Sequence, residues 1–209
     1  MGRPREHDAS TRLALLDAAE RIVEAEGAEA LSVRRVADAV GVSTRAVYST
    51  FGAKPGLLDA LTQRAYDMLT ANLTDLPATV DPADDLVEAS LRVFRPMAIE
   101  HPSLFRLAFL RVVPDLHISD DTKAASAHAF GLLCDRFVRL QDVGALGGRD
   151  PRSCAVTFNA LCEGMATTEL RIRGLLGAEP EAAWRNAFTA LVGGFSLPPP
   201  KPASPGAHP

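Results

Sequence analysis

The amino-acid sequence predicts an all-α protein, in which an N-terminal domain of three helices precedes a larger helical domain and the chain forms about nine helices. Apolar residues recur three and four positions apart along most of the chain, which is the spacing of one helix face. Glycine or proline separates many of these stretches. No stretch of useful length alternates apolar and polar residues as a half-buried strand does.

The first helix is expected over residues 11–26, where the apolar residues share one face. Gly27 then ends it, because glycine readily takes the left-handed conformation that closes many helices. Residues 1–9 are polar and contain Arg3 and Arg5, so we expect a flexible arm there. This charged start lacks the apolar core of a signal peptide.

Two short helices follow, and both have a serine at the capping position. Ser32 precedes apolar residues at i, i+3, i+4 and i+7, and Gly41 can take the positive φ of a tight turn. Ser43 precedes the next helix, which Phe51 and Gly52 close. Two short helices joined by a glycine turn predict a helix-turn-helix motif over residues 32–51. We place this motif in an N-terminal domain over residues 10–56.

The remaining helices are expected in residues 57–195. Lys54 and Pro55 precede a helix that extends to about residue 73, and residues 75–83 form a turn-rich linker. Pro96 should kink or split the next helix. The expected ranges are 84–100, 102 to 112 or 113, 119–143, 152–176 and 180–195. Residues 196–209 contain six prolines, so we expect a disordered tail.

The composition of the 209 residues is that of a globular protein, with 47% hydrophobic residues and a net charge of −4. Three cysteines, at positions 134, 154 and 162, are too few for a disulfide framework and favour a reducing compartment. No stretch approaches the length of a membrane span. We therefore expect a cytoplasmic protein that does not interact with a membrane.

The chain shows no pattern typical of an enzyme. It contains no Glu-x-x-His pair for a metal site within a helical bundle, no cysteine pair at zinc spacing and no glycine-rich phosphate loop. Its five histidines are scattered along the sequence. We expect no catalytic residue, no metal site and no cofactor.

The second short helix of the motif has the features of a helix that reads DNA. Ala46 and Val47 form its inner face, so the other side chains are expected to project outward, namely those of Ser43, Thr44, Arg45, Tyr48 and Ser49. An arginine near the start of such a helix can pair with guanine, a contact worth about 1–3 kcal/mol of discrimination. The hydroxyl groups of Thr44 and Tyr48 can reach a base or a phosphate.

Local charge supports the same interpretation. Residues 32–56 contain four basic residues and one acidic residue, a balance of +3 within an acidic protein. Lys54 precedes a helix start, which is a plausible phosphate site. Arg34 is a further candidate for a contact with DNA. Three alternatives remain open: the helix pair can belong to a bundle that binds no DNA, Tyr48 can be a half-buried core ring, and Arg34 and Arg35 can be solvated charges.

The run VRRVADAVGVSTRAVYSTFGAKPGLLDAL resembles the DNA-binding signature of the TetR/AcrR family. The match spans about residues 10–60 and rests on Gly41, Val42, Ser43, Tyr48, Phe51, Lys54, Leu57 and Leu58. The resemblance implies that Tyr48 and Lys54 hold phosphates and that Thr44, Arg45 and Ser49 face the bases. The sequence departs from the signature at Thr50 and at Pro55-Gly56, which affects sequence preference or the start of the fourth helix.

Two segments of the larger domain, residues 97–109 and 162–176, resemble one group of TetR-family C-terminal domains. That resemblance implies a ligand cavity among the middle helices and dimerisation through the last two, and so assigns these roles to residues 57–195. The candidate ligand residues are Met97, Phe105, Phe109, Phe158 and Glu163. The alternatives are that the apolar ones are plain core and that Glu163 is an exposed carboxylate.

The last helix carries Trp184, Phe188, Leu191 and Val192 on one side. In a homodimer, two such helices from each subunit would form a four-helix interface, which typically buries well over ~1,000 Å². The alternative is that this face packs only within its own subunit.

These features predict a ligand-responsive transcriptional regulator, a homodimeric repressor that a small apolar or amphipathic effector releases from a pseudo-palindromic operator in double-stranded DNA. Two recognition helices must lie about 34–36 Å apart, or a turn more, to enter successive major grooves. A ligand that favours another spacing would shift the population away from DNA. The alternative function is a helical small-molecule-binding protein that has lost DNA binding.

Overall fold

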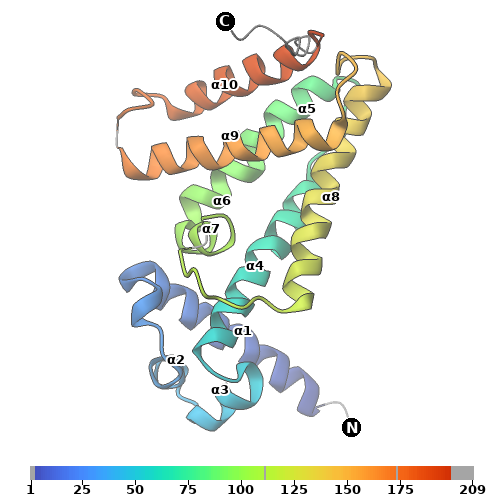
Figure 1. Ribbon diagram of the computed structural model, residues 1–209. Helices are drawn as coiled ribbons and strands as arrows, with labels where there is room; N and C mark the ends of the chain where they lie inside the picture. The colour runs from blue at the N-terminus through green and yellow to red at the C-terminus, as the bar shows by residue number, and fades with distance from the viewer. Residues whose placement is uncertain (1–2, 111, 173, 199–209) are drawn as a thin grey trace, which may run out of the picture.

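A computed structural model describes residues 3–110, 112–172 and 174–198, and within these ranges every regular element is a helix (Figure 1). The predicted all-α class is therefore confirmed. The N-terminal part consists of α1 (Arg3–Glu26), the 3-10 turn η1 (Ala28–Ala30), α2 (Val33–Val40) and α3 (Thr44–Phe51). Helix α1 begins at Arg3, so residues 3–9 continue this helix and are not the separate arm that we expected.

The helix-turn-helix forms through the local chemistry that the sequence predicts. The Ser32 hydroxyl accepts a hydrogen bond from the Arg35 amide, and the Ser43 hydroxyl accepts one from the Ala46 amide, so each satisfies a free N–H at a helix start. Gly41 takes φ 75° and ψ 29° between the two helices. This left-handed conformation strains any side chain, so glycine fits the turn best.

Helix α4 (Lys54–Asp75) connects the motif to the rest of the molecule. A Cβ atom added at Gly56 would lie 1.8 Å from the Phe51 carbonyl oxygen, so the start of α4 can approach the end of α3 only with glycine there. At its other end α4 is held by Arg136, whose Nη2 donates to the carbonyls of Leu73 and Leu76 at 2.9 and 2.7 Å.

The predicted helix at 84–100 is divided, and it starts earlier than expected. It consists of α5 (Pro82–Ala89), the π-helical segment η2 (Ser90–Phe94) and α6 (Arg95–Glu100). The ring of Pro96 excludes the normal bond at its position, and a π turn is one way for a helix to absorb such a break. The Arg95 amide accordingly donates to the carbonyl of Ser90, five residues earlier.

Four further helices follow, and two of them, α7 and α9, end several residues before the positions that we predicted. They are α7 (Pro102–Ala108), α8 (Asp120–Asp142), α9 (Pro151–Arg171) and α10 (Pro180–Phe195). The described residues that follow Ala108 and Arg171 form turns or loops instead of the expected helical extensions. Residues 199–209, most of the proline-rich tail, lie outside the described residues.

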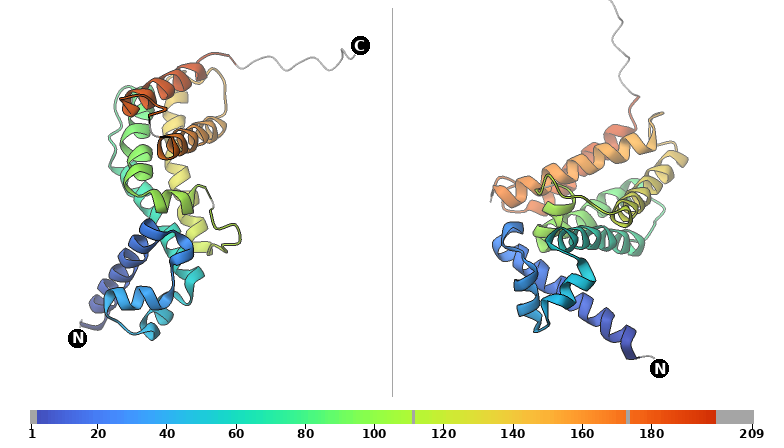
Figure 2. Two further views of the ribbon diagram at one scale, coloured as in Figure 1. Left: turned by 90° about the vertical axis from the view of Figure 1, so that its left-hand side faces the viewer. Right: turned by 60° about the horizontal axis from the view of Figure 1, so that its bottom comes forward.

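The helices form two parts that share α4 (Figures 1 and 2). Helices α1, α2 and α3 lie at one end, and α9 and α10 lie side by side at the opposite end. Between them, α4 and α8 lie alongside each other, η2 and α7 pack against α4, and α5 packs against α8 and α10. Within the described residues, no helix has both the length and the apolar character needed to cross a lipid bilayer.

Candidate nucleic-acid interface and cavity

Helix α3 is anchored by two side chains and exposes most of the others. Val47 is fully buried and Phe51 is 9% exposed, and the Arg12 guanidinium of α1 packs 4.8 Å from the centre of the Phe51 ring. Tyr48 is 57% exposed, so it is a surface residue and not a half-buried core ring. All five outward residues that we predicted are exposed, namely Ser43, Thr44, Arg45, Tyr48 and Ser49.

Local hydrogen bonds differentiate the hydroxyl groups on this surface. Ser43 uses its oxygen to cap α3, and Ser49 and Thr50 both donate to the Ala46 carbonyl, at 2.9 and 2.8 Å. These three groups support the helix as well as facing solvent. Thr44 sits in the first turn of α3 and is exposed, where recognition helices commonly contact base edges.

The three arginines of the motif differ in whether an acidic side chain lies beside them. Arg35 holds α2 to α1, because its Nη1 donates to Glu26 Oε2 at 3.0 Å and to the Ala30 carbonyl at 3.1 Å. The hydrogen bond from Arg35 lowers the pKa of the Glu26 carboxyl. Arg34 is highly exposed and lies only 3.8 Å from Asp38, one helix turn away. Among the described residues, Arg45 forms no ion pair, so it is the cation of α3 that is available to a partner.

Lys54 has a protein partner in this structure. Its ammonium group donates to the Glu29 carbonyl in η1 at 2.9 Å, which fastens the start of α4 to the segment after α1. A lysine ammonium has three donors, so this bond leaves capacity for a phosphate. No pattern in the sequence indicated this link to η1.

A cavity of about 230 Å³ lies beside α4, between it and helices α8 and α9. Its lining comes from α4, η2, the end of α7, α8 and α9, and consists of Tyr66, Leu69, Leu73, Phe94, Ala108, Phe109, Ser126, Ala129, Phe130, Leu133, Asn159 and Glu163. Most of these lining residues are apolar, and Asn159 and Glu163 add polar groups beside them, a combination typical of small-molecule sites. Helix α4 therefore contributes both to the cavity and to the support of α3.

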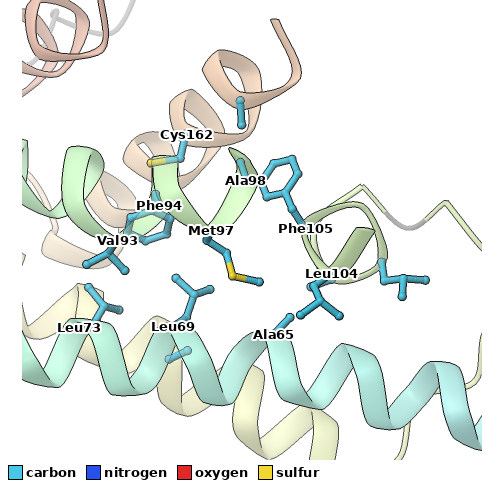
Figure 3. Close-up of a cluster of buried hydrophobic side chains, with 14 of the residues drawn as sticks. Ala65, Leu69, Leu73, Val93, Phe94, Met97, Ala98, Leu104, Phe105 and Cys162 are labelled. Carbon is cyan, nitrogen blue, oxygen red and sulfur yellow. The ribbon is translucent and has the colours of Figure 1, made fainter. Parts of the chain in front are cut away.

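Two of the five predicted ligand residues, Phe109 and Glu163, line this cavity. The other three belong to the core instead. Phe158 is fully buried among aromatic rings, with the Phe188 ring 4.7 Å away. Met97 and Phe105 are 2% and 4% exposed and lie in a buried cluster beside α4 (Figure 3). The sequence does not distinguish core from lining here, because both require apolar residues at helical spacing.

Glu163 is half-buried and hydrogen-bonded on its own helix. Asn159, one turn earlier on α9, donates from Nδ2 to Glu163 Oε1 at 2.7 Å. Burial raises the pKa of the Glu163 carboxyl, and the hydrogen bond from Asn159 partly opposes that rise. Asn159 itself went unrecognised as a lining residue, although its i, i+4 spacing to Glu163 was a usable signal.

A polar network that no sequence pattern indicated joins α1 to the helices of the larger part. His101 Nδ1 lies 2.8 Å from Glu20 Oε1, and the Ser103 amide donates to Glu24 Oε2 at 2.8 Å. Arg64 of α4 binds Asp17 of α1 at 2.6 Å. Glu20 and Glu24 are four residues apart, so one face of α1 presents both carboxylates to the start of α7. The other end of α7 borders the cavity at Ala108.

The apolar side of α10 packs within its own subunit. Trp184 and Phe188 are fully buried and stacked, and Val192 is 4% exposed. Trp184 Nε1 also donates to Glu169 Oε2 at 2.8 Å, and Glu169 in turn binds Arg95 of α6. The structure therefore supports the alternative in which this face of α10 packs within its own subunit.

The fold and the exposed α3 together define a class of protein, a helical DNA-binding regulator with a separate domain that contains a cavity. The model of the bacterial regulatory proteins of the tetR family matches residues 15–61. A second model, described as the tetracyclin repressor-like C-terminal domain, matches residues 87–191. No curated protein matches the chain.

Solved structures agree with the family models. A Rhodococcus sp. RHA1 protein of unknown function is 25% identical, with a TM-score of 0.78 over 90% of this chain and 96% of its own. The TetR-family regulator PfmR from Thermus thermophilus is 21% identical, with a TM-score of 0.67 over 85% and 96% of the two chains. AibR, solved with isovaleryl coenzyme A and operator DNA, is 16% identical, with a TM-score of 0.66 over 88% and 98%.

The chain belongs to the TetR family of bacterial transcriptional regulators. It is a DNA-binding transcription factor and not an enzyme.

Proposed function

We propose that this regulator is a homodimeric repressor that binds a pseudo-palindromic operator and leaves it when a small molecule enters the cavity beside α4. The observation that carries the proposal is the position of α4. This helix lines the cavity with Tyr66, Leu69 and Leu73, and its first turn packs against the end of α3. A ligand that moves α4 would thus change how α3 is presented.

The DNA contacts in this proposal follow from exposure and chemistry. Arg45 and Thr44 face the bases from the first turn of α3, with Ser49 one turn further on. Tyr48 and Lys54 bind phosphates, the tyrosine through an exposed hydroxyl and the lysine beside the start of α4. Arg34, on the exposed face of α2, and the Ser43 hydroxyl add contacts to the backbone.

The dimer in this proposal uses the outer faces of α9 and α10, since the inner face of α10 is occupied. Val156 of α9 is 54% exposed although it is apolar. Small side chains continue this exposed strip on both helices, namely Ala160, Gly164, Ala182 and Ala190. Small residues let helices from two subunits approach closely, which suits a four-helix interface.

Two routes lead from the cavity to the DNA-binding end. One is α4 itself. The other is α7, whose last residue, Ala108, borders the cavity and accepts a 2.8 Å hydrogen bond from the Tyr66 hydroxyl. The first turn of α7 is held by Glu24 of α1. A ligand changes DNA binding only if its affinity differs between the arrangement of these helices that binds DNA and the arrangement that does not. AibR gives a precedent in the fold, with a small molecule and operator DNA bound to one protein.

A mobility-shift assay tests the proposal. The full chain is titrated against the DNA upstream of its own gene, and candidate effectors are selected beforehand by their thermal stabilisation of the protein. We expect a specific shift that a stabilising compound abolishes. Binding of such a compound without any specific DNA shift would favour the alternative, a small-molecule-binding protein that has lost DNA binding. A specific shift that no stabilising compound alters would contradict the effector role.

A further inference from the structure

The cavity beside α4 combines aromatic surface with a single carboxyl group. The rings are those of Tyr66, Phe94, Phe109 and Phe130. Among the described residues of the lining, Glu163 alone carries a carboxyl group, and none is basic. The cavity therefore has a negative site beside apolar surface, without a cation of its own to balance it.

The geometry of Glu163 leaves one oxygen free for a ligand. Asn159 occupies Oε1 at 2.7 Å, and no described group donates a hydrogen bond to Oε2. Burial raises the pKa of this carboxyl because the charged form loses hydration. A positive group placed beside Oε2 would restore part of that lost stabilisation and keep the carboxylate ionised.

We propose that the cavity binds a small organic cation, with a protonated amine, amidine or quaternary ammonium group beside Glu163 and an apolar body among the rings. This inference rests on the proposed function only where it treats the cavity as the effector site. Aromatic faces attract cations through their ring quadrupole, so the rings complement the carboxylate. The volume of about 230 Å³ is below the ~300–1,000 Å³ typical of sites for drug-sized molecules, so the ligand is compact.

An anionic ligand fits the cavity beside α4 less well than a cation does. It would meet the Glu163 carboxylate and find no basic partner among the described lining residues. Arg152 packs over the Phe130 ring at 5.1 Å but is itself exposed and outside the lining. Lys123 lines a neighbouring cavity and is paired with Asp120 at 2.8 Å.

The test uses three probes that share one apolar body and differ in charge: 4-phenylbutylamine, 4-phenylbutanol and 4-phenylbutyrate. A second set replaces the phenyl ring with cyclohexyl. Calorimetry on the full protein without DNA measures each affinity. We expect the amine to bind about ten-fold more tightly than the alcohol in at least one set, since a hydrogen bond to a charged group is worth about 1.5–3 kcal/mol. The carboxylate should bind most weakly.

Variants connect this preference to the cavity. Glu163→Gln should lower amine affinity about ten-fold and leave alcohol affinity unchanged, since the glutamine keeps its shape but not its charge. Glu100→Gln, the same change at an exposed site on α6, is the matched control and should change neither. Phe130→Leu keeps an apolar side chain but removes a ring, and should reduce amine affinity about three-fold. This second variant tests the proposal even where Glu163→Gln does not fold.

The outcomes separate this inference from the regulatory proposal, because operator binding is measured independently. If the amine binds through Glu163 and never alters DNA binding, the effector role is wrong and the ligand class stands. If no probe binds, if the alcohol or the carboxylate binds as tightly as the amine in both sets, or if both variants leave amine affinity unchanged, the inference is overturned, even where another compound releases the DNA.

Discussion

Helix α3 and the cavity beside α4 differ in how their functional residues are held. On α3, each exposed residue belongs to one eight-residue helix whose caps lie next to it in the sequence, at Ser43 and Gly52. The cavity draws its lining from five separate elements, from Tyr66 on α4 to Glu163 on α9. The exposed surface of α3, which we propose contacts DNA, is therefore a local property of the sequence, whereas the cavity exists only when the larger part of the protein has packed. Substitutions in the two regions should accordingly fail in different ways.

The largest effect should come from the core that supports the cavity. Phe158→Ala removes a fully buried ring that contacts Phe94, Phe137 and Phe188, so we expect a loss of about 3–5 kcal/mol in the free energy of unfolding. Urea unfolding measures this loss. Phe130→Ala, at a half-buried lining position, is the control and should cost less. Equal losses would contradict our assignment of Phe158 to the core.

The next effect concerns DNA and not stability. Arg45→Ala should weaken operator binding by about 1–3 kcal/mol, or roughly five- to 150-fold, because it removes the proposed base contact. The free energy of unfolding should stay within about 0.5 kcal/mol of the parent value, as is usual for exposed residues. Fluorescence anisotropy at fixed salt measures the affinity. Arg171→Ala, an exposed arginine at the end of α9, should bind DNA normally. If both variants weakened operator binding equally, the loss would be a non-specific effect of charge and would contradict a base contact by Arg45.

A third variant tests the connection between the two regions. Glu24→Ala removes the acceptor that holds the first turn of α7 to α1. We expect the variant to keep its affinity for effector alone and for DNA alone. The coupling free energy between effector binding and DNA binding should change by about 0.5–2 kcal/mol. DNA titrations with and without effector measure this coupling. Glu29→Ala removes the same charge from an exposed position in η1 and is the control. Unchanged coupling in Glu24→Ala would exclude the route through α7, and α4 would then be the remaining connection between the cavity and α3.

The smallest effect is a pH dependence of stability. Since burial raises the pKa of Glu163 above its ordinary value of 4.5, the unfolded chain releases this proton at a lower pH than the folded protein. Stability is therefore lost as pH rises from about 4.5 through the raised pKa. Glu163→Gln should match the parent near pH 4 and be the more stable protein at pH 7, without ligand. Thermal unfolding across this range measures the difference, and a constant offset would contradict the assigned cause.

The sequence was sufficient for the helix-turn-helix because its signals are local. Ser32, Gly41 and Ser43 determine where helices start and end through contacts within four residues, and Val47 identifies the inner face of α3. The outward residues follow by elimination. The start of α1 was mispredicted because polar residues without an apolar pattern are compatible with both a helix and an arm.

The cavity could be predicted only in part because its lining depends on contacts between distant segments. Phe105 and Phe109 have the same side chain on one short segment, yet Phe105 is buried in the core while Phe109, stacked on it at 5.2 Å, faces the cavity. Periodicity cannot separate the two. The links from Glu20 and Glu24 to the start of α7 join residues about 80 positions apart, and charge pattern alone does not reveal them.

Hydroxyl-radical footprinting of the DNA upstream of the gene tests most directly that α3 reads DNA as part of a twofold dimer. We predict two protected half-sites with centres about 34–36 Å apart, or one helical turn further. At a protein concentration near the Kd of the parent, both should disappear together with Arg45→Ala and persist with Arg171→Ala. A single protected site, or a footprint that Arg45→Ala leaves intact, would contradict this prediction.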